Sequence, residues 1–317
     1  MFFEGPEKKL EIQLSATSTL NLRGLDRSFW EARVRESGAV ILSSVHNDHI
    51  DAFLLSESSL FVYAKRIVMI TCGRTNLATA ASAMVRAWGS DIELLVYERK
   101  NEHFPEYQRT GFMDDARALS RVIPSRAWRF GSADGHRIQM LTSVRPHEAP
   151  NDDRTLEILM HGIHPEAARM FGRDRGKSDA RRREAFQALF TGFEADEYYF
   201  EPTGYSLNAI RGDRYLTIHI TPEDIASYVS FETNLDFGVN PYPWVDKVRA
   251  VFEPQALDVM TFSKAAPEAF DLEEHHRVGW AEERLASGYH VAFRHFERIR
   301  DRADPAFELP LEPASSP

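Results

Sequence analysis

Residues 51–72 read DAFLLSESSLFVYAKRIVMITC, in which three runs of β-favouring residues are broken by Ser-Glu-Ser-Ser and then by Ala-Lys. A hairpin turn explains the polar tetrad at residues 56–59, because serine hydroxyls form local hydrogen bonds in turns. A chemical role is also open, since a serine hydroxyl can attack the carbonyl of its own preceding peptide bond where the fold strains the backbone. The stretch predicts paired β-strands and leaves the purpose of its turn to the rest of the chain.

The composition is that of an ordinary globular protein. The 317 residues are 43% hydrophobic and 27% charged, with a formal net charge of -10 at pH 7. This acidic balance argues against nucleic-acid binding and suits a cationic small molecule better. The single cysteine, Cys72, excludes an internal disulfide framework and fits a reducing compartment. Without an apolar run of ~18 residues or a signal peptide in MFFEGPEKK, we expect a cytoplasmic protein that does not bind membranes.

Strand-like segments dominate the chain, and helical patterns lie between them. The strand-like segments lie at about 9–14, 38–45, 51–72, 92–98, 137–143, 153–160, 214–221, 227–233, 256–263 and 289–296. The helical patterns lie at about 75–88, 107–121, 165–171, 183–190 and 242–252. Hairpins interleaved with single helices predict an α+β sandwich of mainly antiparallel sheets with helices outside, rather than a doubly wound parallel sheet.

Four of these strands carry a polar face. The polar positions that share a face are Asp153, Thr155 and Glu157; Thr217, His219 and Thr221; Lys9 and Glu11; and Ser230 and Glu232. An antiparallel sheet with one side in solvent explains such a pattern. If the faces are enclosed instead, their carboxylates must be paired or must hold a cation, because a bare buried charge is too costly.

Several residues suggest chemistry on local grounds. Cys72 ends an apolar strand and precedes Gly73 and a helix start, a place that can lower the pKa of a thiol and expose it, although a buried inert cysteine is equally consistent. Ser206 and His219 lie on consecutive strand-like segments and can face each other. No acid completes a hydrolase triad with them.

We predict no metal site from the sequence. The adjacent histidine pairs are His46/His49, His161/His164 and His275/His276. None of these pairs comes with clustered cysteines or a helical H-E-x-x-H motif, so structural or surface roles are expected.

Ordered blocks spread over about residues 2–235 identify the chain as resembling a known family. They are FFEGPEKKLE, LSESSLFV, TCGRT, YERKN, TLEILM, GYSLNAI, YLTIHITPE and SYVSFETN. They resemble the eukaryotic-type S-adenosylmethionine decarboxylase proenzyme, a pyruvoyl-dependent carboxy-lyase of spermidine and spermine biosynthesis. The resemblance implies a four-layer αββα sandwich of two mainly antiparallel sheets, with the polar strand faces between them.

The resemblance gives the turn at residues 56–59 its chemical role. It implies that Ser58 attacks the Glu57 carbonyl and that elimination and hydrolysis leave a pyruvoyl group at residue 58, which serves as the Schiff-base electron sink in place of pyridoxal phosphate. We therefore expect one domain over residues 1–317, cleaved into a β chain, 1–57, and an α chain, 58–317, with a mobile tail at 303–317. No metal is expected.

The remaining roles are implied position by position. Ser206 matches the serine that supports processing, His219 the base for β-elimination, and Cys72 the proton donor to the decarboxylated carbon. The residues matched to S-adenosylmethionine binding are Phe3, Glu4, Leu55, Glu57, Phe200 and Glu223. In this assignment Phe3 and Phe200 sandwich the adenine, and Glu223 binds the ribose hydroxyls.

The sequence departs from the mammalian branch at a buried regulatory site. Ile70 replaces a lysine and Lys9 replaces an apolar residue in the acidic site that binds putrescine there. The matching polar residues Glu11, Asp153, Thr155, Glu157 and Glu232 are kept. A tethered ammonium at Lys9 would supply the cation that these carboxylates need, so we expect putrescine not to be required.

Two other functions stay open beside this one. One is a pyruvoyl decarboxylase of arginine or ornithine, which the adenine-binding residues disfavour. The other is an inactive paralogue that activates a partner decarboxylase, which the complete set of processing residues disfavours. The protein is expected to be a monomer or a homodimer of αβ protomers.

Overall fold

The computed structural model describes residues 5–172, 176, 178–223 and 226–299, which form two antiparallel sheets of eight strands each. The first sheet has the order β2 (Ile41–His46), β3 (Asp51–Leu55), β4 (Ser58–Val62), β5 (Arg66–Thr71), β1 (Lys8–Leu14), β6 (Ile92–Lys100), β8 (Arg137–Ser143) and β7 (Ser125–Gly131). The second has the order β10 (Glu194–Tyr199), β11 (Tyr205–Arg211), β12 (Arg214–Thr221), β13 (Tyr228–Thr233), β9 (Arg154–His161), β14 (Ala256–Ser263), β16 (His290–Arg298) and β15 (His275–Arg284).

The two halves of the chain repeat one topology, because β9 to β16 occupy the same relative places as β1 to β8. Helices also recur in equivalent connections. The α-helices are α1 (Arg27–Ser37), α2 (Leu77–Trp88), α3 (Phe112–Ser120), α4 (Pro165–Arg169), α5 (Ala180–Gln187) and α6 (Tyr242–Phe252), with short 3-10 helices at Leu22–Gly24, Gly89–Asp91 and Pro105–Tyr107. Thus α1 follows β1 as α4 and α5 follow β9, and α2 follows β5 as α6 follows β13.

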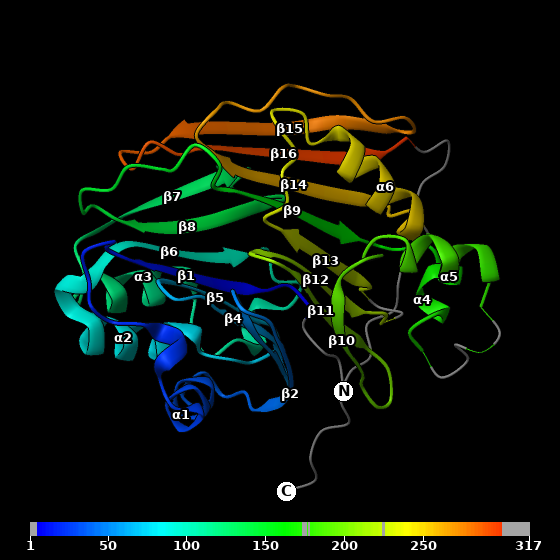
Figure 1. The fold of residues 1–317 in the computed structure, drawn as a ribbon. Helices are drawn as coiled ribbons and strands as arrows, with labels where there is room; N and C mark the ends of the chain where they lie inside the picture. Colours follow the sequence, from blue (N-terminus) through cyan, green and yellow to red (C-terminus); the bar gives the residue numbers. More distant parts are fainter. Residues whose placement is uncertain (1–4, 173–175, 177, 224–225, 300–317) are drawn as a thin grey trace, which may run out of the picture.

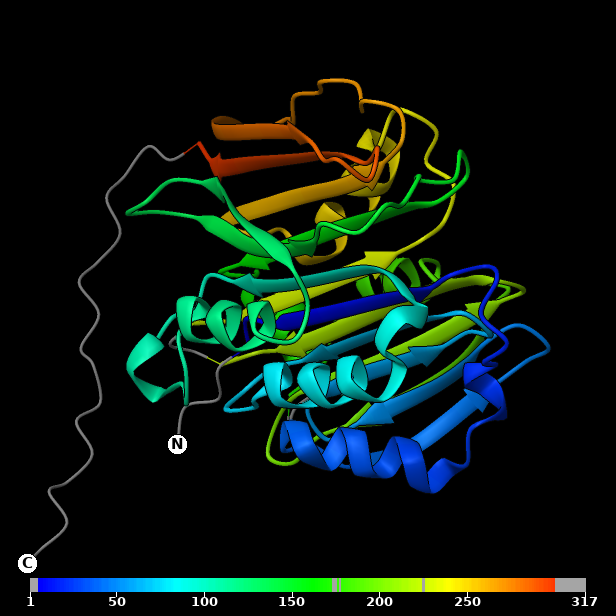
Figure 2. The ribbon, with the colours of Figure 1, turned by 90° about the vertical axis from the view of Figure 1, so that its left-hand side faces the viewer.

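The helices cover the outer faces of the sheets, as Figures 1 and 2 show. Two-residue alternation in β1 accounts for the first pair of layers: Leu10, Ile12 and Leu14 pack with the apolar residues of α1, α2 and α3. A second apolar cluster joins α4, α5 and α6 to the other sheet. The predicted four-layer αββα sandwich is confirmed.

The space between the sheets is apolar at two ends and polar in the middle. One apolar cluster joins residues such as Val96 and Met140 to Met260 and Phe293, and another is built around Phe61 against Tyr215. The polar faces of β1, β9, β12 and β13 meet between these clusters and are buried. The enclosed alternative is therefore correct, and the solvent-facing one is wrong.

The sequence patterns missed elements whose faces are largely polar. Helix α1 has only three buried residues, and strands β10 and β15 lie at a sheet edge with mostly half-buried or exposed side chains. The predicted strand 51–72 is three strands, β3 to β5. The tail expected at 303–317 lies outside the described residues.

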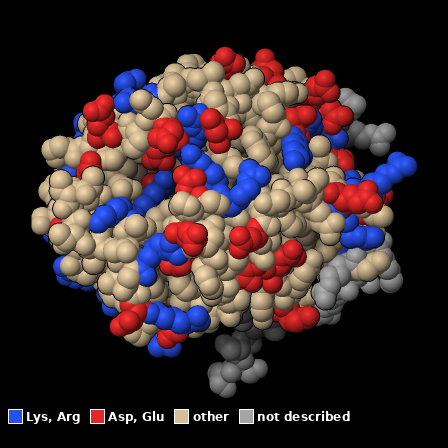
Figure 3. All heavy atoms as spheres, in the orientation of Figure 1, with Lys and Arg blue, Asp and Glu red and all other residues tan. Residues whose placement is uncertain are grey.

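The charges on the surface are mixed. Acidic and basic side chains are interspersed on the face shown in Figure 3. Among the described residues, no helix is both long enough and apolar enough to cross a bilayer.

Candidate active site

The first residue of β4, which directly follows the turn between β3 and β4, has a strained backbone conformation. Ser56 and Glu57 form the turn, Leu55 pairs with Ser58, and Ser56 exchanges hydrogen bonds with the backbone of Val40. Ser58 has φ of 133°, in the region that favours glycine, which costs a serine on the order of 1–3 kcal/mol. Its Oγ is buried without a hydrogen-bond partner. The structure thus shows a hairpin turn next to a strained serine whose nucleophile is free.

Two hydrogen bonds converge on the Glu57 carbonyl, which precedes Ser58. The backbone N–H of Cys72 donates to this oxygen at 2.8 Å, and the Cys72 thiol donates at 3.2 Å. Such donors polarise a carbonyl and stabilise the negative charge that develops on it under nucleophilic attack. Strain at Ser58 and polarisation at Glu57 therefore act on the same peptide bond.

Cys72 is buried, so of the two alternatives that the sequence left open, the exposed thiol with a lowered pKa is excluded. Burial, reinforced by the carboxyl groups of Glu57 and Glu7, raises the pKa of the Cys72 thiol well above its ordinary value, although Lys8 opposes the shift. The helix start cannot lower this pKa because α2 begins only at Leu77, five residues beyond Cys72. A thiol that keeps its proton can act as an acid but not as a nucleophile at neutral pH.

Ser206 and His219 face each other as predicted. They are directly paired between β11 and β12, and Ser206 Oγ lies 2.9 Å from His219 Nδ1. The other ring nitrogen, Nε2, lies 2.9 Å from Thr217 Oγ1 and 3.1 Å from Ser59 Oγ. The ring is therefore held at both nitrogens.

The neighbours of His219 determine which of its nitrogens carries the proton. Ser59 directs its hydroxyl hydrogen to Asn208 Oδ1 at 2.5 Å, and Thr217 directs its own to Asn208 Oδ1 or to the Leu207 carbonyl, both at 3.0 Å, so their oxygens are acceptors toward His219. His219 thus donates from Nε2 and presents the Nδ1 lone pair toward Ser206. Burial lowers the pKa of His219 to about 3, so the ring is neutral and able to act as a base.

Sequence reasoning missed the parts played by Ser59 and Asn208. Ser59 belonged to the polar tetrad, but its contacts with Asn208 and His219 run from the first sheet to the second. They depend on how the two sheets are stacked. Asn208 lies at the inward position of β11 opposite Thr217. The two-residue alternation of GYSLNAI places it on the same face as Ser206, and that signal could have identified it.

A cavity of about 310 Å³ brings the candidate residues together. Ser58, Cys72, Ser206 and His219 line it, and so do Glu57, Phe200 and Glu223. Its volume is at the lower end for small-molecule sites. Three glutamates line the cavity while no described Lys or Arg does, which favours a cationic ligand. Burial, partly offset by Lys8, raises the pKa of Glu57 to about 7.

Three predicted binding residues are placed differently from the rest. The Leu55 side chain is buried on the helix side of the first sheet, so only its main chain can contribute to binding at the cavity. Phe3 and Glu4 lie outside the described residues. Of the two residues predicted to sandwich the adenine, only Phe200 is among those described.

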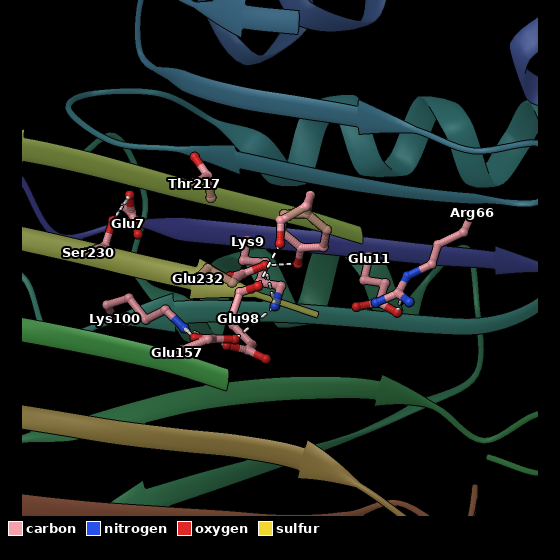
Figure 4. A network of polar contacts seen from close by, with 12 residues as sticks. Glu7, Lys9, Glu11, Arg66, Glu98, Lys100, Glu157, Thr217, Ser230 and Glu232 are labelled. Carbon is pink, nitrogen blue, oxygen red and sulfur yellow. Dashed lines mark hydrogen bonds and ion pairs between the residues drawn. The ribbon is translucent and has the colours of Figure 1, made fainter. Parts of the chain in front are cut away.

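The predicted regulatory site is a buried network of charges (Figure 4). Lys9 Nζ lies 2.8 Å from Glu157 Oε1 and 3.0 Å from Glu232 Oε1. Burial works to lower the pKa of Lys9, but Glu157 and Glu232 outweigh it and raise that pKa well above its ordinary value. Tyr215 donates a hydrogen bond to Glu232. Lys9 therefore supplies a cation between the sheets.

Two further cations in this network were not predicted. Lys100 pairs with Glu157 and, at 2.6 Å, with Glu98. Arg66 lies 2.9 Å from both Glu11 and Asp153, and so forms ion pairs with the acidic residues that Lys9 does not contact. Lys100 lies outside the strands whose polar faces were identified, and Arg66 lies at the first residue of an otherwise apolar strand, which hid both from pattern reasoning.

Little free space is left beside these cations. The cavity lined by Lys9, Glu11, Arg66, Asp153 and Thr155 has a volume of about 10 Å³. That is room for about one water molecule and not for a diamine.

Comparison with known proteins assigns the chain to a family. A family model described as adenosylmethionine decarboxylase matches residues 1–303. The chain belongs to the adenosylmethionine decarboxylase family. Relatives include S-adenosylmethionine decarboxylase proenzymes of Dictyostelium discoideum, 32% identical with 80% of this chain and 72% of the relative covered, and of Drosophila melanogaster, 33% identical with 85% of each covered.

A solved structure has a similar fold. The crystal structure of the Trypanosoma brucei AdoMetDC-delta26 monomer matches with a TM-score of 0.58 and 21% identity, covering 76% of this chain and 99% of that one. This likeness concerns the fold alone.

Proposed function

We propose that this chain is a self-processing decarboxylase that converts S-adenosylmethionine to its decarboxylated form, the aminopropyl donor for spermidine and spermine. The observation that carries the proposal is the strained Ser58, with a free buried Oγ, next to a carbonyl that Cys72 polarises. A strained backbone, a free hydroxyl and a polarised carbonyl do not stabilise a hairpin, but each of them promotes acyl transfer to a serine.

Processing begins as an exchange of one acyl bond for another. Ser58 Oγ bonds to the Glu57 carbonyl carbon, the C–N bond breaks, and the amine of residue 58 takes up the hydroxyl proton. Relief of the strained backbone at Ser58 favours this step. Cys72 stabilises the oxyanion from its N–H and thiol, and the result is an ester that links Glu57 to residue 58.

Elimination then separates the two chains. His219, neutral at pH 7, removes the Cα proton of residue 58, while the bond from Cβ to the ester oxygen breaks. Glu57 leaves as a carboxylate that ends the chain 1–57. The dehydroalanine at residue 58 takes up water and releases ammonia, so that the chain 58–317 begins with a pyruvoyl group. Ser206 Oγ, 2.9 Å from His219 Nδ1, orients the ring, and its hydroxyl turns away when that nitrogen takes the proton.

The residues around position 58 fit such a group. Ser58 opens into the cavity beside Cys72, and the cavity is large enough for a nucleoside-sized ligand. A pyruvoyl group there supplies the electron sink for loss of carboxylate. Phe200 offers an aromatic face to a sulfonium and Glu223 offers a carboxylate to ribose hydroxyls. Cys72, which keeps its proton, is the acid beside the reacting carbon.

The buried cations replace an external activator. Lys9 and Arg66 already neutralise the carboxylates of the regulatory site, and the remaining cavity holds about one water. Activity and processing are therefore independent of putrescine. A free diamine would have to displace tethered cations that lose no translational freedom on binding.

A denaturing gel and a substrate panel test the function. The purified protein should show bands of about 6 and 30 kDa, in proportion to the 36.2 kDa of the whole chain. Ser58→Ala should leave one band, while Ser56→Ala, which keeps the nucleophile, should still be cleaved. Release of carbon dioxide from S-adenosylmethionine, and not from arginine or ornithine, should depend on cleavage. An uncleaved wild type, or a cleaved Ser58→Ala chain, would refute the proposal.

A further inference from the structure

A cluster of histidines surrounds one buried aspartate away from the cavity. The cluster consists of Asp258 in β14, His161 at the end of β9, His136 between β7 and β8, His295 in β16, and His103 after β6. His136 and His103 come from the half of the chain that forms the first sheet, and the others belong to the second sheet. No pair of these histidines was adjacent in sequence, so only the fold brings them together.

Three of these side chains present ligand atoms to one point. His136 Nδ1 lies 3.2 Å and His161 Nε2 3.5 Å from Asp258 Oδ2, and the three atoms lie within 4.8 Å of one another. An ion with bonds of ~2.0–2.1 Å in tetrahedral geometry separates its ligand atoms by roughly 3.3 Å. The separations of His136 and His161 from Asp258 are close to that spacing, and the ligand atoms of the three residues all lie within 4.8 Å of one another.

The surrounding histidines have the places of outer-shell partners. His295 Nδ1 lies 2.7 Å from the other oxygen of Asp258 and fixes the orientation of the carboxylate. His103 Nε2 lies 3.4 Å from His161 Nδ1, the nitrogen that does not face Asp258. Metal-ligating side chains are commonly held in this way, with the second ring nitrogen or second oxygen engaged by a neighbour.

Burial and access also suit an ion. Asp258 is 1% exposed, and a carboxylate so buried needs a cation or several donors. The His136 side chain is 28% exposed, so the site is accessible to solvent on that side. His161 Nε2, although buried, forms no hydrogen bond of good geometry.

We propose that His136, His161 and Asp258 bind one divalent transition-metal ion, of which zinc suits the ligands best. Two imidazoles and one carboxylate favour zinc or cobalt over magnesium and calcium, which prefer all-oxygen sites. The ion ties the turn between β7 and β8 to the second sheet. The proposal does not depend on the decarboxylase activity.

Metal titration of the purified full-length chain tests this site. Calorimetry with zinc should show one site of micromolar or tighter affinity, and cobalt should give the visible absorption of a tetrahedral nitrogen and oxygen complex. His136→Ala, at a partly exposed position, should weaken binding by more than about 100-fold, and His295→Gln by ~10–100-fold, the range for outer-shell partners. His276→Ala is the matched control and should bind as wild type does.

Each alternative result overturns the proposal. The wild type could fail to bind micromolar zinc or cobalt, or His136→Ala could retain the affinity of the wild type. A thiolate-to-cobalt band would assign the ion to Cys72 instead. If His136→Ala does not fold, Asp258→Asn, which keeps the size of the side chain, replaces it and must show the same loss of metal affinity. Its thermal midpoint without metal shows whether it is folded.

Discussion

Removing the ammonium of Lys9 should destabilise the protein strongly. Lys9 is 2% exposed and contacts Glu157 and Glu232 at 2.8 and 3.0 Å. Deleting one partner of a buried ion pair costs about 3–5 kcal/mol, because the other charge stays buried. Lys100 still holds Glu157 and Tyr215 still donates to Glu232, so Lys9→Met should fall at the lower end, about 3 kcal/mol.

The cost should grow with pH. Burial already raises the pKa of Glu232, and Lys9 is the main group that lowers it. Without Lys9 the folded-state pKa rises further above the unfolded value. The contribution of such a group is complete below the unfolded pKa and is lost as pH rises through the folded pKa. Urea unfolding of Lys9→Met should therefore differ more from wild type near pH 8 than near pH 5.5.

A surface lysine provides the control for this experiment. Lys264 pairs with the exposed Glu148 at 3.1 Å, and such pairs contribute about 0–1 kcal/mol. Lys264→Met should therefore stay close to wild type at both pH values. If Lys9→Met is as stable as Lys264→Met, or if its deficit is the same at both pH values, the network does not depend on Lys9.

Putrescine measures the same site through activity. Millimolar putrescine should leave the processing and decarboxylation rates of the wild type unchanged and should raise those of Lys9→Met, where an ammonium is missing. A several-fold stimulation of the wild type would refute the tethered-cation argument, whatever the unfolding experiments give.

His219→Ala should stop processing at the ester, because the base for elimination is gone, so hydroxylamine should cleave the chain and a mature pyruvoyl terminus would contradict the assignment. Ser59→Ala removes an acceptor from the protonated nitrogen of His219, and should slow elimination several-fold while leaving ester formation intact; an equal effect on both steps would point to simple misfolding. Cys72→Ala should be processed slowly and decarboxylate poorly, and normal turnover would exclude Cys72 from the site. Burial raises the pKa of Glu7 to about 8 although Ser230 donates to it at 2.7 Å, so its favourable contribution to stability is complete below about pH 4.5 and lost through pH 8. Glu7→Gln should accordingly gain stability relative to wild type near pH 8.5 and not near pH 5.5, as unfolding midpoints would show.

The sequence by itself determined the class of fold and predicted which residues carry the chemistry. Two-residue alternation along β1, β9, β12 and β13 predicted strands with one polar face, because a strand's side chains point alternately to opposite sides whatever surrounds it. Ser58, Cys72, Ser206 and His219 were found from local context and from ordered blocks that resemble a known family. Such signals are short-range, and they survive without knowledge of the packing.

Tertiary structure alone decided what those residues experience. The positive φ of Ser58, the burial that keeps a proton on Cys72, and the proton position on His219 depend on strands that are far apart in the chain. The sequence could not decide between a lowered pKa and a buried thiol at Cys72, because it showed the helix start but not the burial of the side chain. Desolvation is a property of everything that surrounds a group, so no local pattern contains it.

The repeated topology and the charge network have the same origin. The identical strand order of the two halves places β1 next to β5 and β6, and β9 next to β13 and β14, and stacking the sheets brings Lys9 onto Glu157 across 148 residues of chain. Alternation predicted which side of each strand is polar, but not which polar strands of one sheet lie against which polar strands of the other. That choice is made by register and sheet packing, where the energy of pairing buried charges decides between arrangements that look alike in sequence.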